Sequence, residues 1–334
     1  MSTLEQKAIE LDEIRKARIL RSNEIDVDKY LAASDISLQV KNASEWLDKI
    51  KRDYVTPPES IKCQMPWTKT HGEFSFRPGE VTVYAGANGH GKSLITGQIA
   101  LYLVKQCAKV CIASFEMKPE RTLHRMLRQF SGEFIDDPMT RDKAKYIEIL
   151  TGRFDAFIGD KLWLYDQQGS TNPKIVIAMA RYCAVELGIQ HIFIDSLMKC
   201  VNAEDDYNQQ KYFVDELTAL ARDHNVHIHL IHHVRKLQSE EVAPNKNDLK
   251  GSGSIADQVD NVLIMWRNKK KSNMLRAGER VDPGMPDAYL MCEKQRNGEA
   301  EEMYALWFNA ASQQFVEDLG LGPMDFDNRG QFVR

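Results

Sequence analysis

The sequence predicts an α/β fold with a mostly parallel central sheet, antiparallel strands toward the C-terminal end and a short helical N-terminal extension. Between residues 81 and 232, short apolar runs alternate with helical stretches, a pattern typical of a parallel sheet covered on both faces by helices. Beyond residue 260 we expect only further strands, joined as antiparallel hairpins. A glycine-rich turn follows the first strand and opens a helix.

The elements can be assigned by periodicity and by their flanking residues. The expected strands share short apolar runs bounded by turn residues: Val81–Ala85, Val110–Phe115, Leu162–Tyr165, His191–Asp195, His227–His232, Val262–Trp266, Ala288–Glu293 and Tyr304–Phe308. The expected helices are Pro119–Phe130, Ile175–Leu187 and Gln209–Asp223. Asn172 and Pro173 supply the cap and first-turn signals of the second helix. We expect the basic run Lys269–Lys271, with Arg276 and Arg280, to lie in a solvated loop.

Residues 1–60 differ from the rest of the chain, because they are charged, lack glycine and favour helices. Apolar residues recur near helical spacing from Leu4 to Ile14, and a second short helix is expected at Ser44–Ile50. Residues 5–22 are expected to form a linker helix that packs on the adjacent subunit and closes the ring. This segment is too small to build a core alone. We expect it to dock on the main domain, residues 61–319, or on a neighbouring subunit; residues 320–334 are expected to form a flexible tail.

Composition bounds the class of protein. The chain has 334 residues, of which 43% are hydrophobic and 28% charged, as expected for a globular protein with a sizeable core. Its formal net charge of −4 gives no overall basic field for nucleic acid, so any DNA contact must be local. The six cysteines contain no CxxC pair, which argues against zinc and favours a reducing cytosol. Neither a secretory signal nor a membrane span is expected.

The stretch Gly86–Ser93 matches the phosphate-binding pattern G-x4-G-K-[ST]. Its glycines allow backbone N–H groups to wrap phosphates, and the following helix directs its positive end at them. Lys92 is expected to reach the β- and γ-phosphates and Ser93 to ligate magnesium, so the expected cofactors are ATP and Mg²⁺. The expected nucleotide contacts are Gly86, Ala87, Asn88, Gly89, His90, Gly91, Lys92, Ser93 and Leu94.

Two carboxylates follow other strands of the predicted sheet. Asp195 ends an apolar strand, where an acid has little structural reason to be, and it suits the metal-linked aspartate of a P-loop ATPase. Glu116 follows the strand after the P-loop helix, where a carboxylate can orient the water that attacks the γ-phosphate. Helix capping for Asp195 and a chance strand-end acid for Glu116 are the structural alternatives.

The ordered motifs RPGEVTVYAGANGHGKS, SFEM, HIFIDSL, LIHHVRK, LKGSGSIADQVDNVLIMWRN and EKQRNGE resemble the RecA-fold ATPase core of DnaB-like replicative helicases, particularly the phage ring helicases and Twinkle. The resemblance covers roughly residues 70–310. It implies a RecA-like P-loop NTPase core and a ring, expected to be a homohexamer, that hydrolyses ATP, moves 5′ to 3′ on single-stranded DNA and unwinds forked duplex DNA.

The resemblance also implies residue roles. Glu116 falls on the catalytic glutamate and Asp195 on the metal-linked aspartate. His232 or His233 falls on the γ-phosphate sensor, with His233 the better match. Lys294 and Arg296 match a basic pair that reaches into the next subunit's ATP site. The expected DNA contacts are Lys236, Lys246, Lys250 and Gly251.

Other functions remain open from the sequence. A RecA/RadA-like recombinase or an ATP-switched DNA clamp or loading factor could use the same phosphate site. Primase chemistry is not expected within this chain, so a separate primase, polymerase or loader is an expected partner. The expected location is the cytoplasm of a bacterial or phage-infected cell, without membrane attachment.

Overall fold

In the computed structural model, the described residues are 63–137, 142–201, 207–235, 239, 241–250 and 254–327. Before residue 63 they are 19–20, 25–32 and the single positions 44, 47, 50, 51 and 55. The linker helix predicted over residues 5–22 and the helix predicted at 44–50 lie largely outside the described residues; Ile19 and Leu20, inside the predicted linker helix, form a short strand instead. Among the described residues, no helix combines the length and apolar character that crossing a membrane requires.

A 10-stranded sheet in the order β1-β4-β3-β5-β6-β2-β7-β8-β9-β10 forms the centre of the described residues. Its strands are β1 (Ile19–Leu20), β2 (Val81–Ala85), β3 (Val110–Ser114), β4 (Leu162–Tyr165), β5 (His191–Asp195), β6 (His227–Ile231), β7 (Asn261–Arg267), β8 (Ala288–Gln295), β9 (Met303–Asn309) and β10 (Gln314–Val316). The strands from β1 to β7 in this order pair in parallel, and those from β7 to β10 pair antiparallel. The predicted fold class is confirmed.

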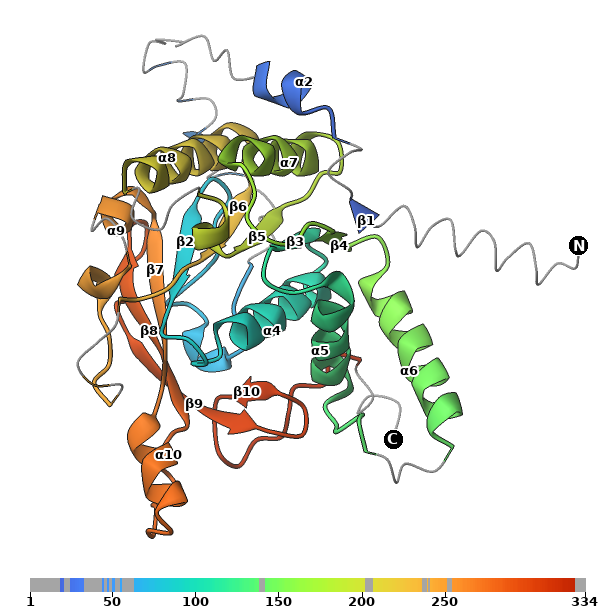
Figure 1. Ribbon diagram of the computed structural model, residues 1–334, viewed down its shortest axis with the longest axis vertical. Coiled ribbons are helices and arrows are strands. Elements are labelled where there is room, and N and C mark those ends of the chain that lie inside the picture. The colour runs from blue at the N-terminus through green and yellow to red at the C-terminus, as the bar shows by residue number, and fades with distance from the viewer. Residues whose placement is uncertain are drawn as a thin grey trace, which may run out of the picture.

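Helices cover both faces of the parallel strands (Figure 1). One face carries α4 (Lys92–Lys105), α5 (Pro119–Ser131) and α6 (Lys143–Ile158); the other carries α7 (Pro173–Val185) and α8 (Tyr207–His224). The short α2 (Val27–Ala32) packs outside α7. β2, β3, β5 and β6 are buried along their whole length, so apolar and polar residues do not alternate strictly along them.

Parallel pairing brings the carboxyl ends of the central strands to one edge. β2 lies between β6 and β7, and β5 lies between β3 and β6. The turn after β2 therefore lies beside the ends of β3, β5 and β6, which are followed by Glu116, Ser196 and His232. Ligands in open α/β sheets bind at this edge. The sheet thus brings Lys92, Glu116, Asp195 and His233 to one end of the central strands, whereas Lys294 and Arg296 lie elsewhere.

Two sequence predictions are wrong. The basic run is not a loop, since Lys269–Arg276 forms helix α10; α6 and α9 (Ser254–Gln258) are further helices not predicted from the sequence. The side chain of Asn268 caps α10 by accepting the Lys271 N–H at 3.0 Å, which explains why a helix forms here without an apolar stripe. α10 extends away from the body of the sheet (Figure 1).

The tail is the second correction. Phe326 is buried and packs against Phe157, and Gln314 Nε2 donates to the Met324 carbonyl at 3.1 Å. Residues 324–327 are therefore part of the packed domain rather than a loose tail. Residues 328–334 lie outside the described part of the chain.

Candidate nucleotide-binding site

The phosphate-binding loop joins β2 to α4, as predicted. Gly91 is the N-cap of α4 with φ of 95°, a conformation that glycine adopts without strain. Gly86 is required for a different reason: a Cβ atom there would lie 2.5 Å from the Met265 carbonyl oxygen. The loop is therefore pressed against β7, and its backbone can approach a ligand closely.

Lys92 lies buried beneath the loop. Its Nζ donates to the Gly86 carbonyl at 2.8 Å and to the Ala87 carbonyl at 3.0 Å. Burial lowers the pKa of Lys92 to about 8, against the opposing effect of Asp195 and Glu116. The ammonium group is thus held at the place where the phosphates of a bound nucleotide would meet it.

Ser93 and Asp195 form the next contact. Ser93 Oγ donates to Asp195 Oδ2 at 2.9 Å. Burial and the nearby Glu116 raise the pKa of Asp195, whose carboxyl group faces the start of α4 through the Ser93 contact. A hydroxyl and a carboxylate are the hard donors that Mg²⁺ takes, together with phosphate oxygens and water. Across the described ranges, no group of three or more His, Cys, Asp or Glu side chains is arranged to hold a metal ion.

Glu116 lies where the sequence placed it, beyond the end of β3. Its Oε1 accepts the Ser196 hydroxyl at 2.9 Å and lies 3.6 Å from His233 Nε2. The His233 ring and the Ser196 hydroxyl lower the pKa of Glu116 to about 2, against the effect of burial. The carboxylate is therefore ionised at neutral pH and fixed by two partners. Ser196 was not among the predicted site residues, although its position directly after Asp195 was a usable signal.

The two adjacent histidines have different surroundings. His233 faces Glu116, whereas the buried His232 ring bonds the Lys250 carbonyl through Nε2. Burial lowers the pKa of His232 to about 4, so the ring is neutral at physiological pH. The Lys250 N–H in turn donates to the His233 carbonyl at 2.8 Å. Both histidines are thus linked to the segment that begins at Lys246.

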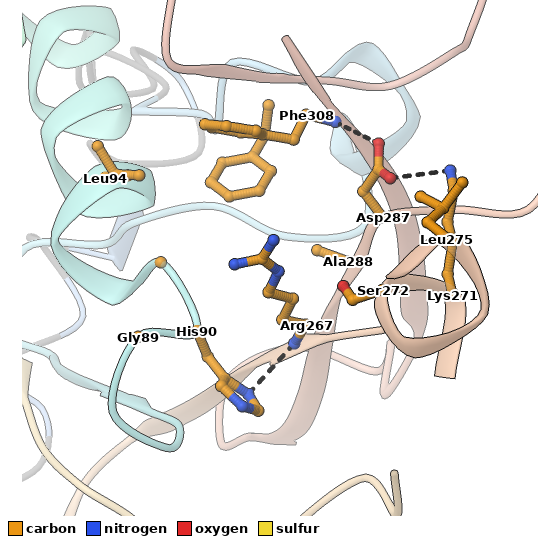
Figure 2. A pocket seen from close by; sticks show the side chains of 12 residues that line it. Gly89, His90, Leu94, Arg267, Lys271, Ser272, Leu275, Asp287, Ala288 and Phe308 are labelled. Carbon is orange, nitrogen blue, oxygen red and sulfur yellow. Dashed lines mark hydrogen bonds and ion pairs between the residues drawn. The ribbon is translucent and has the colours of Figure 1, made fainter. Parts of the chain in front are cut away.

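A cavity of about 170 Å³ opens beside the loop (Figure 2). The side chains of Arg267 and Phe308 reach it from β7 and β9, and Phe315 lines it from β10. Asp287 holds this wall together, because it accepts the Phe308 N–H at 2.9 Å and pairs with Lys271 of α10 at 2.8 Å. The sequence did not predict this cavity, since its walls come from strands that only the sheet order brings together.

His90 connects the loop to this cavity. Its Nδ1 accepts the Arg267 backbone N–H at 3.2 Å, and the residue is buried (Figure 2). The unusual histidine of the loop therefore joins the end of β7 to the phosphate-binding turn.

Lys294 and Arg296 lie beside the amino-terminal end of β2, whereas the phosphate-binding loop follows its carboxyl-terminal end. Val262 pairs with Lys294, and the Arg296 N–H donates to the Asp260 carbonyl at 2.9 Å, at the end where β2 begins. A strand rise of ~3.3 Å per residue puts roughly 16 Å between this end and Gly86. An arginine side chain cannot cover that distance, so neither cation belongs to the site of its own chain.

The predicted DNA contacts are only partly described. Lys236 and Gly251 lie outside the described residues. Lys246 Nζ donates to the Glu293 carbonyl at 3.1 Å, and the Lys250 backbone is bonded to both histidines. The side chains of Lys246 and Lys250 are both half-buried, and that of Lys246 lies beside β8.

A G-x4-G-K-S loop between a central strand and its helix, at the carboxyl end of a mostly parallel sheet, defines the class as a P-loop nucleotide-binding protein. Residues 70–317 match the family described as the DnaB-like helicase C terminal domain, and the chain belongs to this family.

Curated relatives agree with this assignment. The chain is 26% identical over 262 residues to the DNA helicase/primase of Enterobacteria phage T3, covering 70% of this chain and 45% of that protein. It is 23% identical over 246 residues to the Twinkle homolog protein, chloroplastic/mitochondrial, of Arabidopsis thaliana, covering 68% and 35%. The matched part is thus less than half the length of these relatives.

Solved structures support the fold. One solved ATPase domain has a TM-score of 0.70 at 15% identity, covering 84% of this chain and 99% of that one. A DnaB-like replicative helicase, solved in a study of its interactions with primase, has a TM-score of 0.65 at 16% identity, covering 93% and 76%. At these identities the likeness establishes the architecture alone.

Proposed function

We propose that this protein is an ATP-dependent, ring-forming DNA helicase that moves 5′ to 3′ on single-stranded DNA. The observation that carries the proposal is the gathering of Lys92, Ser93, Glu116 and Asp195 at one sheet edge in a member of the DnaB-like family. Direction of movement, ring size and the identity of a primase or loader partner rest on the resemblance alone.

The resident residues divide the hydrolysis between them. Lys92 binds the β- and γ-phosphates as a buried cation, in a site where charge interactions are stronger than in water. Ser93 and Asp195 would hold Mg²⁺, which would supply charge neutralisation on the phosphates. Glu116 orients the attacking water, and Ser196 and His233 fix the carboxylate in position. His233, 3.6 Å from Glu116, would lie next to the reacting phosphate, which suits the sensor role.

The nucleobase fits the cavity beside the loop. Arg267 and Phe308 offer a guanidinium plane and an aromatic ring, the two surfaces on which bases stack. His90 fixes the backbone of Arg267 against the loop that holds the phosphates. Base and triphosphate would thus be bound by one continuous surface.

The site is completed by a neighbouring subunit. Arg296 is roughly 16 Å from its own loop by strand length, so it can serve only another chain's nucleotide. A cation brought against the γ-phosphate stabilises the charge that spreads in the transition state. Hydrolysis would therefore depend on assembly, and it would run around a closed ring.

A groove on the domain suits the N-terminal extension of a second copy. A cavity of about 920 Å³ lies between α5, α6 and β4, with an apolar floor that includes Leu127, Phe154 and Leu164. β1 pairs with β4 of its own chain, so residues 1–18 directly precede a strand beside this groove. We propose that this amphipathic segment crosses to the groove of the adjacent subunit. Deleting residues 1–18 should then convert rings to monomers in light scattering; rings that persist would contradict the proposal.

DNA contact is assigned to the segment from Lys236 to Gly251. Its cations and backbone N–H groups can hold phosphates without reading base sequence. His232 and His233 both bond Lys250, so a movement at the γ-phosphate has a short covalent and hydrogen-bonded path to this segment.

The experiment is ATPase activity with and without single-stranded DNA, paired with unwinding of a forked duplex. Wild-type protein should show both activities, and Lys92→Ala should lose both while folding normally. ATPase without unwinding would favour a clamp or loading factor. Open filaments with strand exchange, seen in place of rings by electron microscopy, would favour a recombinase.

A further inference from the structure

The ammonium group of Lys294 is fully occupied within its own chain. Its Nζ donates to the carbonyl oxygens of Ala256 at 2.7 Å, Asp257 at 3.0 Å and Val259 at 2.8 Å. An ammonium group has three N–H donors, so none is left for a phosphate. Helix α9 ends at Gln258, and the last carbonyls of a helix have no partner within it. Lys294 therefore caps the C-terminal end of α9.

Arg296 is held at the same place but is not fully occupied by the described residues. Its NH1 donates to Asp260 Oδ1 at 2.9 Å, and its NH2 donates to the carbonyls of Asp257 at 3.0 Å and Gln258 at 3.3 Å. A guanidinium has five N–H donors, so donors remain after these contacts. The side chain is 38% exposed, which leaves it accessible to a neighbouring chain.

Asp260 joins Arg296 to the strand that carries the phosphate loop. The side chain is only 4% exposed, and its Oδ2 accepts the Val81 N–H at 2.9 Å at the start of β2. The backbones of Asp260 and Val81 are also bonded, through the Asp260 N–H and the Val81 carbonyl at 3.0 Å. Arg222 lies 3.8 Å from the same carboxylate and balances its charge.

We infer that Lys294 and Asp260 are positioning residues for Arg296, which alone supplies the cation to the neighbouring ATP site. This inference rests on the proposed ATP site shared between neighbouring subunits, here called the trans site. It gives Lys294 and Arg296 different roles in that site. Lys294 anchors β8 to the end of α9, and Asp260 directs the guanidinium outward from the start of β2. Lys294 and Asp260 together form a rigid support for Arg296, here called the mount. Only Arg296 contacts the γ-phosphate.

The mount also connects DNA binding to the position of Arg296. α9 lies in sequence directly after the proposed DNA-binding segment, and its other end is the cap formed by Lys294 and Arg296. A displacement of α9 on DNA binding would be passed to Arg296 through these carbonyl contacts. Lys294 and Arg296 both contact this end of α9, so DNA would adjust the position of Arg296 through the end of the helix.

A double-mutant cycle in assembled rings tests the inference. ATP turnover with saturating single-stranded DNA is measured for wild type, Lys294→Met, Arg296→Ala and the double variant. We expect Arg296→Ala to lower kcat by about 1,000-fold. Lys294→Met should lower kcat by about tenfold, with KM for ATP unchanged within about twofold, because it acts only through orientation.

The double variant decides between the two roles. If Lys294 acts through Arg296, the double variant should match Arg296→Ala within about twofold, and Asp260→Asn should be equally silent in that background. A further drop of about tenfold or more in the double variant would show that Lys294 contacts phosphate itself and would overturn the mount, while leaving the trans site intact. Wild-type turnover in Arg296→Ala rings would instead overturn the trans site and the mount with it. Lys294→Gln keeps two N–H donors and carries the same cycle if Lys294→Met fails to fold.

Discussion

Nucleotide affinity should fall about tenfold between pH 7 and pH 9, because Lys92 loses its proton in this range. Burial lowers the pKa of Lys92 to about 8 in the protein without nucleotide. With that pKa, the cationic fraction is roughly 0.9 at pH 7 and roughly 0.1 at pH 9. Bound phosphates favour the protonated form, so binding at pH 9 must first restore the proton. The expected loss is about tenfold in affinity, or about 1.4 kcal/mol.

The assay is equilibrium binding of a fluorescent, non-hydrolysed ATP analogue across pH 7 to 9 at constant ionic strength. Lys92→Met is the matched control, because it keeps most of the length of the side chain without the charge. Its affinity should be weak and independent of pH. A wild-type affinity that is flat across this range, or a Lys92→Met variant with the same slope, would refute the assignment of the pH dependence to Lys92.

Further predictions follow from the same contacts. Glu116→Gln should lower kcat by about 100-fold or more while ATP affinity stays within about threefold, as measured by steady-state phosphate release and equilibrium binding; because the pKa of Glu116 is about 2, the wild-type rate should show no acid limb from this group above about pH 4. Phe308→Ala should raise KM for ATP by about tenfold through lost stacking, and unchanged affinity would place the base elsewhere. Gly86→Ala should weaken ATP binding because its Cβ would meet the Met265 carbonyl at 2.5 Å, whereas Gly152→Ala, with no atom within 4 Å, should bind normally. Phe326→Ala should destabilise the domain by about 3 kcal/mol in chemical denaturation. An unchanged stability would show that residues 324–327 are a loose tail after all.

The strands could be predicted closely because burial on both faces gives a strong local signal. β2, β4 and β5 begin and end at the predicted residues. The helix opened by Asn172 was equally accessible, and the Asn172 side chain does accept the Lys174 N–H at 2.9 Å. Phosphate-loop spacing and strand-end carboxylates are also local patterns, which is why the proximity of Lys92, Ser93, Glu116 and Asp195 could be predicted.

Other features depend on contacts between distant segments. α10 has a mostly polar sequence, and it is fixed by the Asn268 cap and by the pairing of Lys271 with Asp287. The cavity beside the phosphate-binding loop needs β7, β9 and β10 close together, which no local pattern specifies. The capping of α9 by Lys294 likewise becomes visible only once β8 lies beside the end of that helix.

The most direct test of the account is to mix Lys92→Ala and Arg296→Ala subunits, each inactive alone, and to measure ATP turnover of the mixed rings. If every site takes Lys92 from one chain and Arg296 from its neighbour, random mixing in equal amounts leaves about a quarter of the interfaces complete. Turnover should then recover toward about a quarter of the wild-type rate and vary with the mixing ratio. Turnover that stays at the level of the single variants at every ratio would contradict an ATP site shared between subunits.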